Sequence, residues 1–137
     1  VMTLRGEKLP PPLTPEQQIA ERYPEAAAWL AETITRVKAV EEAAAGIDLD
    51  ALKVRVDRRE MRGRTILEAI RFRAVQEYPF MLLNPSDYRG MGFQAINAND
   101  VYLVERLAEG VPEEVKGALT ELRDHLNTLQ TILQTIN

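Results

Sequence analysis

The side chains that most often perform catalysis are scarce in this chain of 137 residues. It contains no cysteine, a single histidine (His125) and a single serine (Ser86). Without cysteine there is neither a thiol nucleophile nor a thiolate metal site. Ser86 has no G-x-S-x-G context, so a nucleophile pair with His125 would depend on distant folding alone. The sequence therefore predicts a non-enzymatic protein.

Metal and nucleotide motifs are also missing from the sequence. A transition-metal site built on histidine and cysteine needs more such ligands than one histidine. Di-iron helical bundles use paired Glu-x-x-His motifs, and neither copy occurs here. The "GMG" of residues 90–92 is not followed by Lys-Ser/Thr and does not extend to G-x-G-x-x-G. We therefore expect no metal and no cofactor.

Arginine is concentrated between residues 55 and 73. This window holds seven of the chain's thirteen arginines against three acids, so it carries about +4, whereas the whole chain carries −4. Guanidinium groups form strong, often bidentate hydrogen bonds with carboxylates and phosphates. The window is therefore a candidate contact surface for an anionic partner.

The seven arginines have different expected environments. A Thr65–Glu68 capping box predicts a helix over 65–78. On that helix, Arg64 and Arg71 would flank Glu68 as a charge ladder, and Arg73 would lie closer to the apolar side as a packed or interface arginine. The strongest positive patch then surrounds an exposed connector at Gly63. Its members are Arg58, Arg59, Arg62 and Arg64.

Three interpretations of this patch remain open. The arginines are solvated or paired internally, or they dock on an acidic protein such as a second copy of this chain, or they contact nucleic-acid phosphates. Nearby aromatics could supply stacking surfaces, but the sequence has no helix-turn-helix or RNA-binding motif. The candidate partner-binding residues are Arg58, Arg59, Arg62, Arg64, Arg73, Tyr88 and Arg89.

A heptad pattern follows Pro112 and predicts one long C-terminal helix. Its apolar residues are spaced alternately by four and three. They are Val115, Leu119, Leu122, Leu126, Leu129, Leu133 and Ile136. This seam could pack inside its own bundle or against a second copy, and the two can coexist. We expect a homo-oligomer, most simply a dimer, with His125 a partly exposed residue beside the seam.

The N-terminal part of the chain gives clear helix signals after an extended arm. Residues 1–13 form that arm, because three successive prolines favour polyproline II geometry. Thr14 and Gln17 form a capping box that begins a short helix, and Pro24 opens a longer one that stops near Gly46. The arm is expected to pack on its own domain or on a neighbouring subunit.

Two further segments have less regular patterns. Residues 52–57 alternate like a short strand, although part of their spacing also suits a helix. Residues 84–99 are rich in turn-forming residues, which predicts a long loop and a possible contact region. A helix over 99–109 would then be capped by Asn99 or Asp100.

Together these features predict one mainly α domain. It would be a bundle of about four or five helices with a small β element near 52–57. We expect a protein-binding, adaptor or regulatory protein that acts through helical surfaces and self-association. The alternative is a small nucleic-acid-binding protein that uses the arginine-rich connector 55–64. The absence of cysteine and of any 18-residue apolar run favours a cytoplasmic location without a membrane span.

Overall fold

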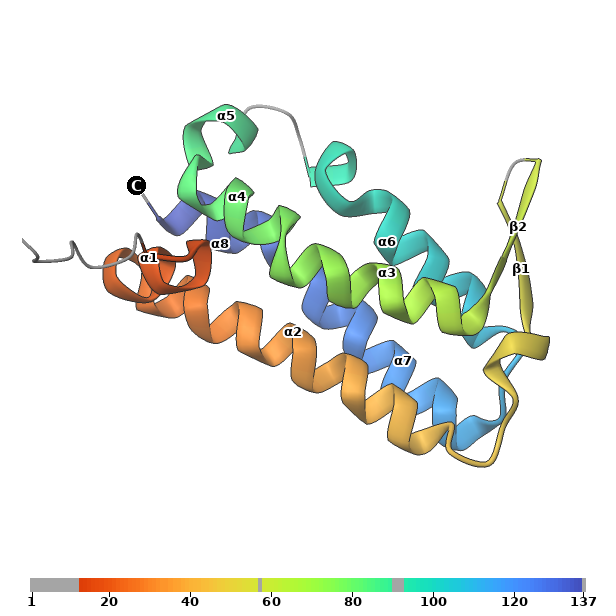
Figure 1. The fold of residues 1–137 in the computed structure, drawn as a ribbon. Coiled ribbons are helices and arrows are strands. Elements are labelled where there is room, and N and C mark those ends of the chain that lie inside the picture. The colour runs from red at the N-terminus through yellow and green to blue at the C-terminus, as the bar shows by residue number, and fades with distance from the viewer. Residues whose placement is uncertain (1–12, 57, 90–92, 137) are drawn as a thin grey trace, which may run out of the picture.

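Four long helices run side by side along the molecule (Figure 1). The computed structural model describes residues 13–56, 58–89 and 93–136, without the side chains of residues 56, 89 and 93–97. The long helices are α2 (Pro24–Ala43), α3 (Gly63–Val75), α6 (Phe93–Ala108) and α7 (Glu113–Leu126). Contacts follow the ring α2–α3–α6–α7–α2, so each long helix packs against two others. The predicted mainly α bundle is confirmed.

Shorter elements close the two ends of this bundle. At one end lie α1 (Pro15–Arg22), α4 (Glu77–Leu83), α5 (Pro85–Arg89) and α8 (Leu129–Thr135). At the other end lie a 3₁₀ turn, η1 (Leu49–Ala51), and a hairpin of β1 (Lys53–Val56) and β2 (Arg59–Arg62). Helix α3 connects the hairpin directly to the opposite end (Figure 1).

The start of α1 follows the prediction. The Thr14 hydroxyl oxygen accepts a hydrogen bond from the Gln17 backbone N–H at 3.2 Å, and the Gln17 side-chain oxygen accepts one from the Thr14 N–H at 2.9 Å. Pro24 then occupies the first turn of α2, where its missing N–H costs nothing. Residues 1–12 of the predicted arm lie outside the described residues.

The C-terminal seam is part of the core of a single chain. All seven seam residues are at most 6% exposed, because α7 packs between α2 and α6 and α8 packs against α5 and α6. The predicted single helix is divided at Asn127 and Thr128, where α7 ends and α8 begins. The Thr128 hydroxyl accepts the Trp29 indole N–H at 2.7 Å and donates to the His125 carbonyl at 2.6 Å. These bonds hold the turn, and the heptad spacing continues into the core beyond it.

The predicted β element is confirmed but incomplete. Residues 53–56 form β1, and the segment expected as an exposed connector contributes β2. In their antiparallel register Val54 faces Met61 and Arg55 faces Glu60. Val54 is buried and Met61 half-buried, so this face of the hairpin packs on the bundle. The alternation of 52–57 alone does not predict that the next residues form a second strand and pair with the first.

Helix α3 begins earlier and ends earlier than predicted. Its N-terminal cap is Arg62, without a side-chain cap hydrogen bond, so the Thr65–Glu68 capping box is wrong. The first helical residue, Gly63, lies against the bundle: a Cβ there would be 3.0 Å from the Leu49 carbonyl oxygen and 3.2 Å from Leu107 Cδ1. This close contact fixes where the hairpin meets the helix.

The predicted long loop over 84–99 is largely helical. Within the described residues, Pro85–Arg89 form α5 and α6 starts at Phe93. Asn99 and Asp100 therefore lie inside α6, and neither is its N-cap. Asp100 is buried on the side of α6 that faces α3, where its carboxylate pairs with Arg73. Pro79, expected to end α3, instead lies in the first turn of α4, where proline is tolerated.

Candidate partner-binding surfaces

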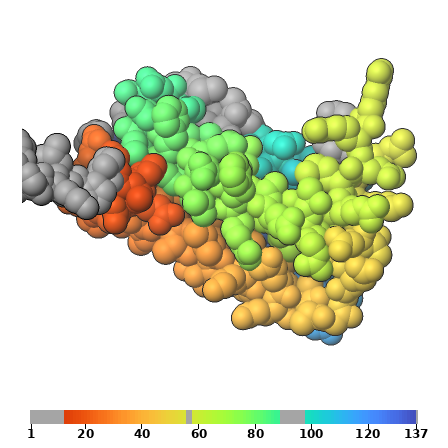
Figure 2. All heavy atoms as spheres, viewed as in Figure 1, coloured from red at the N-terminus to blue at the C-terminus, as the bar shows by residue number. Residues whose placement is uncertain are grey.

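The basic hairpin consists of β1, β2 and the two residues between them. It projects beyond the bundle in the ribbon view, and its yellow atoms stand out from the molecular outline in Figure 2. Side chains of facing residues in an antiparallel pair lie on the same side of the sheet. The register therefore places Lys53, Arg55, Glu60 and Arg62 on the outer face, opposite the packed face. That outer face carries three cations and one acid.

Two arginines of the predicted patch contact a residue outside the sequence window, Asp50, and one of them forms an ion pair with it. Arg62 donates to the Asp50 carbonyl oxygen at 3.0 Å, and the Arg64 Nε lies 3.3 Å from an Asp50 carboxylate oxygen. By contrast, Arg55, Arg58 and Arg59 form no ion pair with any residue that the structure describes. All three side chains are exposed. These three guanidinium groups thus keep their positive charge uncompensated by any described residue.

The predicted charge ladder around Glu68 is wrong. Arg71 pairs with Glu41 of α2, and Arg64 pairs with Asp50. Both acids come from the preceding segments, which the fold brings alongside α3. Tertiary partners have replaced the local i,i+3 and i,i+4 partners that the helix spacing offers.

An aromatic surface lies near the other end of α3, where α3, α4 and α5 meet. Phe72 and Phe80 are 57% and 55% exposed, and the rings of Phe80 and Tyr88 meet edge to face with centroids 6.4 Å apart. Together with three neighbours these side chains surround a hollow of about 390 Å³. The aromatic surface comprises Phe72, Gln76, Glu77, Phe80, Met81 and Tyr88. Tyr88, a predicted partner residue, is half-buried here; the side chain of Arg89 lies outside the described ones.

An ion pair between half-buried Arg73 and buried Asp100 is linked to the aromatic surface through Glu77, which lies 3.5 Å from Arg73. Arg73 Nε is 3.0 Å from a carboxylate oxygen of Asp100, close enough for an ion pair although the N–H is not aligned for a hydrogen bond. The Tyr78 hydroxyl donates to the same carboxylate oxygen. Burial raises the pKa of Asp100, and the Tyr78 hydrogen bond and the Arg73 charge act in the opposite direction. Arg73 is therefore the packed arginine that the sequence predicted, whereas the role of Asp100 was missed.

The single histidine is a packing residue of the same region. Its ring stacks on Trp29 with centroids 4.8 Å apart, and Trp29 also meets Tyr78 edge to face at 5.5 Å. The Thr33 hydroxyl donates to the Trp29 carbonyl, so His125 Nε2–H is the donor toward the Thr33 oxygen at 2.7 Å. Burial lowers the pKa of His125. The prediction of a partly exposed helix residue is confirmed, and its contacts stabilise the bundle.

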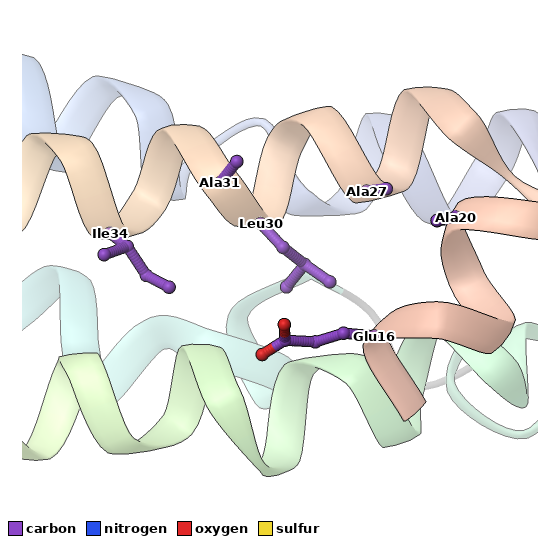
Figure 3. A pocket seen from close by; sticks show the side chains of 6 residues that line it. All are labelled: Glu16, Ala20, Ala27, Leu30, Ala31 and Ile34. Atoms are coloured by element: carbon purple, nitrogen blue, oxygen red, sulfur yellow. The ribbon is translucent and has the colours of Figure 1, made fainter. Parts of the chain in front are cut away.

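A second, smaller hollow lies between α1 and α2 (Figure 3). It measures about 280 Å³ and is lined by Glu16, Ala20, Ala27, Leu30, Ala31 and Ile34. In Figure 3 the Glu16 side chain lies across the hollow from α2, which contributes only apolar side chains to it. One carboxylate over a row of small residues offers little chemistry with which to recognise a ligand.

The described part of the chain contains neither a metal-binding cluster nor a membrane-spanning helix. No group of three or more histidine, cysteine, aspartate or glutamate side chains there is arranged to hold a metal ion. Within the same residues, no helix has both the length and the apolar character required to cross a membrane.

Comparison of the chain with protein-family models, with curated proteins and with solved structures found no match.

Proposed function

We propose that this chain is a non-enzymatic protein-binding protein whose contact surface is the aromatic surface, and that its first partner is a second copy of itself. The observation that carries the proposal is the exposure of Phe72 and Phe80 beside a hollow of about 390 Å³. Burying a phenylalanine side chain is worth about 1.5–3 kcal/mol relative to leaving it in water. Aromatic side chains are enriched in interface cores for this reason.

The shape of the surface favours a symmetric pair. An isologous interface uses the same patch on both copies, so the patch must complement itself. The aromatic surface has projecting rings next to a hollow large enough to receive a ring. A two-fold axis through it would place the Phe80 ring of each copy against the hollow of the other. Both copies would then bury their most exposed aromatic side chains together.

The burial of the heptad seam also favours the aromatic surface as the site of self-association. Self-association through the heptad residues would require opening the bundle, because α2, α5 and α6 already cover them. Self-association through α3, α4 and α5 requires no rearrangement of the core. It also leaves the basic hairpin free, which is what an adaptor with two contact surfaces needs.

The test is sedimentation velocity of the full chain over a wide range of concentrations. We expect a reversible monomer–dimer equilibrium, and Phe72→Asp/Phe80→Asp should weaken it at least tenfold, or about 1.4 kcal/mol. Tyr102→Asp is the matched control, because Tyr102 is also an exposed aromatic, at 44%, but lies on α6 outside the aromatic surface. Circular dichroism would verify that each variant is folded. A wild-type chain that stays monomeric, or a double variant that dimerises normally, would reject the proposal.

A further inference from the structure

We infer that the basic hairpin binds the phosphate backbone of double-stranded nucleic acid. This activity goes beyond self-association and uses the opposite end of α3. The inference begins with the distribution of charge. An acidic chain places Arg55, Arg58 and Arg59 on a projecting element, where no described residue forms an ion pair with them. Such a local field attracts polyanions even when the net charge of the protein is negative.

The kind of cation also suits phosphate. Four of the five basic residues of the hairpin are arginines, and the fifth is Lys53. The planar guanidinium group matches two phosphate oxygens at once, and it is less strongly hydrated than an ammonium group. Its contacts with phosphate therefore cost less desolvation than the same contacts made by lysine.

The dimensions of the element match a groove of a duplex. A two-stranded antiparallel ribbon has its strands about 4.8 Å apart. The major groove of B-form DNA is about 12 Å wide and admits such a ribbon, with phosphates on both walls. With the packed face of Val54 and Met61 turned toward the bundle, the outer face and the tip are the parts that reach a duplex.

The composition of the hairpin favours a duplex over a single strand. Proteins that hold single-stranded nucleic acid stack its bases on aromatic side chains. Residues 53–62 contain no aromatic residue, and the exposed Phe72 and Phe80 belong to the far part of α3 and to α4. The hairpin can thus offer charge and shape, which is the chemistry of sequence-independent backbone contact.

The same composition disfavours an acidic protein as the partner. Protein interfaces usually have a desolvated apolar or aromatic anchor at their centre. On the outer face of the hairpin the side chains are Lys53, Arg55, Glu60 and Arg62, while the apolar Val54 is buried against the bundle. A surface of charges without an anchor fits a uniform polyanion better than a folded protein.

The position of the hairpin is held by the bundle. Arg62 donates to the Asp50 carbonyl oxygen, and the Gly63 N–H donates to the Leu52 carbonyl oxygen at 2.9 Å. Gly63 itself is in close contact with Leu49 and Leu107. These contacts anchor the base of the ribbon, so that its tip reaches a ligand without prior ordering of the whole element.

The experiment is fluorescence anisotropy with a labelled 20-base-pair DNA duplex and the full chain. We expect binding at 50 mM salt that weakens steeply by 200 mM, with a slope of about −0.9 per phosphate contact on logarithmic axes. Arg58→Gln/Arg59→Gln should weaken binding at 50 mM salt by at least about tenfold and reduce the slope by about two. Glu60→Gln, which removes the acid of the outer face, should strengthen binding.

The matched control is Arg22→Gln/Lys38→Gln, which removes the same charge from exposed positions on α1 and α2. It should bind the duplex like the wild-type chain, and circular dichroism would show that all variants are folded. Equal losses in the two double variants, or no binding at 50 mM salt, would overturn the inference. Tighter binding of a single strand, or displacement of the duplex by an equal charge of polyglutamate, would overturn the choice of partner.

Discussion

The two ends of α3 differ in what they expose and in what lies beneath the exposed side chains. At its N-terminus the basic hairpin exposes arginines above a small packed face of Val54 and Met61. Toward its C-terminus the aromatic surface exposes phenylalanine rings, and in the same region Tyr78 contacts both the Arg73–Asp100 pair and Trp29. The exposed arginines lie on a projecting strand pair, whereas the exposed phenylalanines lie on helices that also contribute to the core.

The two surfaces are stabilised by different kinds of interaction. The hairpin depends on one close backbone contact at Gly63 and on hydrogen bonds to Asp50 and Leu52. At the aromatic end, the half-buried Arg73 pairs with the buried carboxylate of Asp100 and with Glu77 at 3.5 Å, and Tyr78 donates to Asp100. Variants that remove these interactions should therefore differ in how much they lower the free energy of unfolding and in how that change depends on pH.

The largest effect is expected from Asp100→Ala. Asp100 is 2% exposed and accepts the Tyr78 hydrogen bond beside Arg73, which keeps a second ion pair with Glu77 at 3.5 Å. Removal of the carboxylate leaves the Tyr78 hydroxyl without this acceptor and should lower the free energy of unfolding by about 2–3 kcal/mol. Urea unfolding measures the change. Glu109→Ala is the control, because Glu109 forms an exposed ion pair with Arg106 at 2.9 Å and its loss should cost less than about 1 kcal/mol. Similar losses in both variants would mean that the Asp100 carboxylate does not support the aromatic end.

The next effect is expected at the base of the hairpin, from Gly63→Ala. The added Cβ would lie 3.0 Å from the Leu49 carbonyl oxygen, so we expect a loss of about 1–3 kcal/mol. Gly117→Ala is the matched control in α7, where a Cβ meets nothing within 4 Å. That control should gain roughly 0.5–1 kcal/mol from helix propensity. Opposite signs in urea unfolding would confirm the close contact, and a gain in both variants would refute it.

The smallest effect is expected from His125 and depends on pH. Because burial lowers its pKa in the folded chain, the unfolded chain takes up a proton first as the pH falls below the ordinary value of 6.5. The free energy of unfolding should therefore decrease from pH 7.5 to 5.5, by at most about 1.4 kcal/mol per pH unit. His125→Gln should decrease less over this interval. Urea unfolding at both values tests this, and parallel decreases in the two chains would contradict it.

Local patterns in the sequence predicted the parts of the fold that local contacts decide. The Thr14–Gln17 capping box spans four residues, and it forms as its spacing indicates. The heptad spacing identified residues that are all buried. It did not reveal the turn at Asn127 and Thr128, because the spacing of four and three is the same on both sides of the turn. One of the hydrogen bonds that hold this turn comes from Trp29, almost a hundred residues earlier.

The candidate surfaces were predicted only in part, because long-range partners decide which charges remain exposed. Arg64 and Arg71 were assigned to Glu68, yet Asp50 and Glu41 reach them across the fold. Asp100 resembled a helix cap, and only its pairing with Arg73 of α3 makes it a core residue. Arg58 and Arg59 were identified correctly as exposed cations, although the β-hairpin that presents them was not predicted.

Helix α3 also sets a distance between the two surfaces. Its 13 residues span roughly 20 Å at 1.5 Å per residue. A symmetric dimer joined at the aromatic surface would hold two hairpins at the outer ends of two such rods, up to about 40 Å apart. One helical turn of duplex is about 34–36 Å. After the first hairpin binds, the second would meet the same duplex at a high effective concentration, so two weak contacts would act with the avidity of one strong contact.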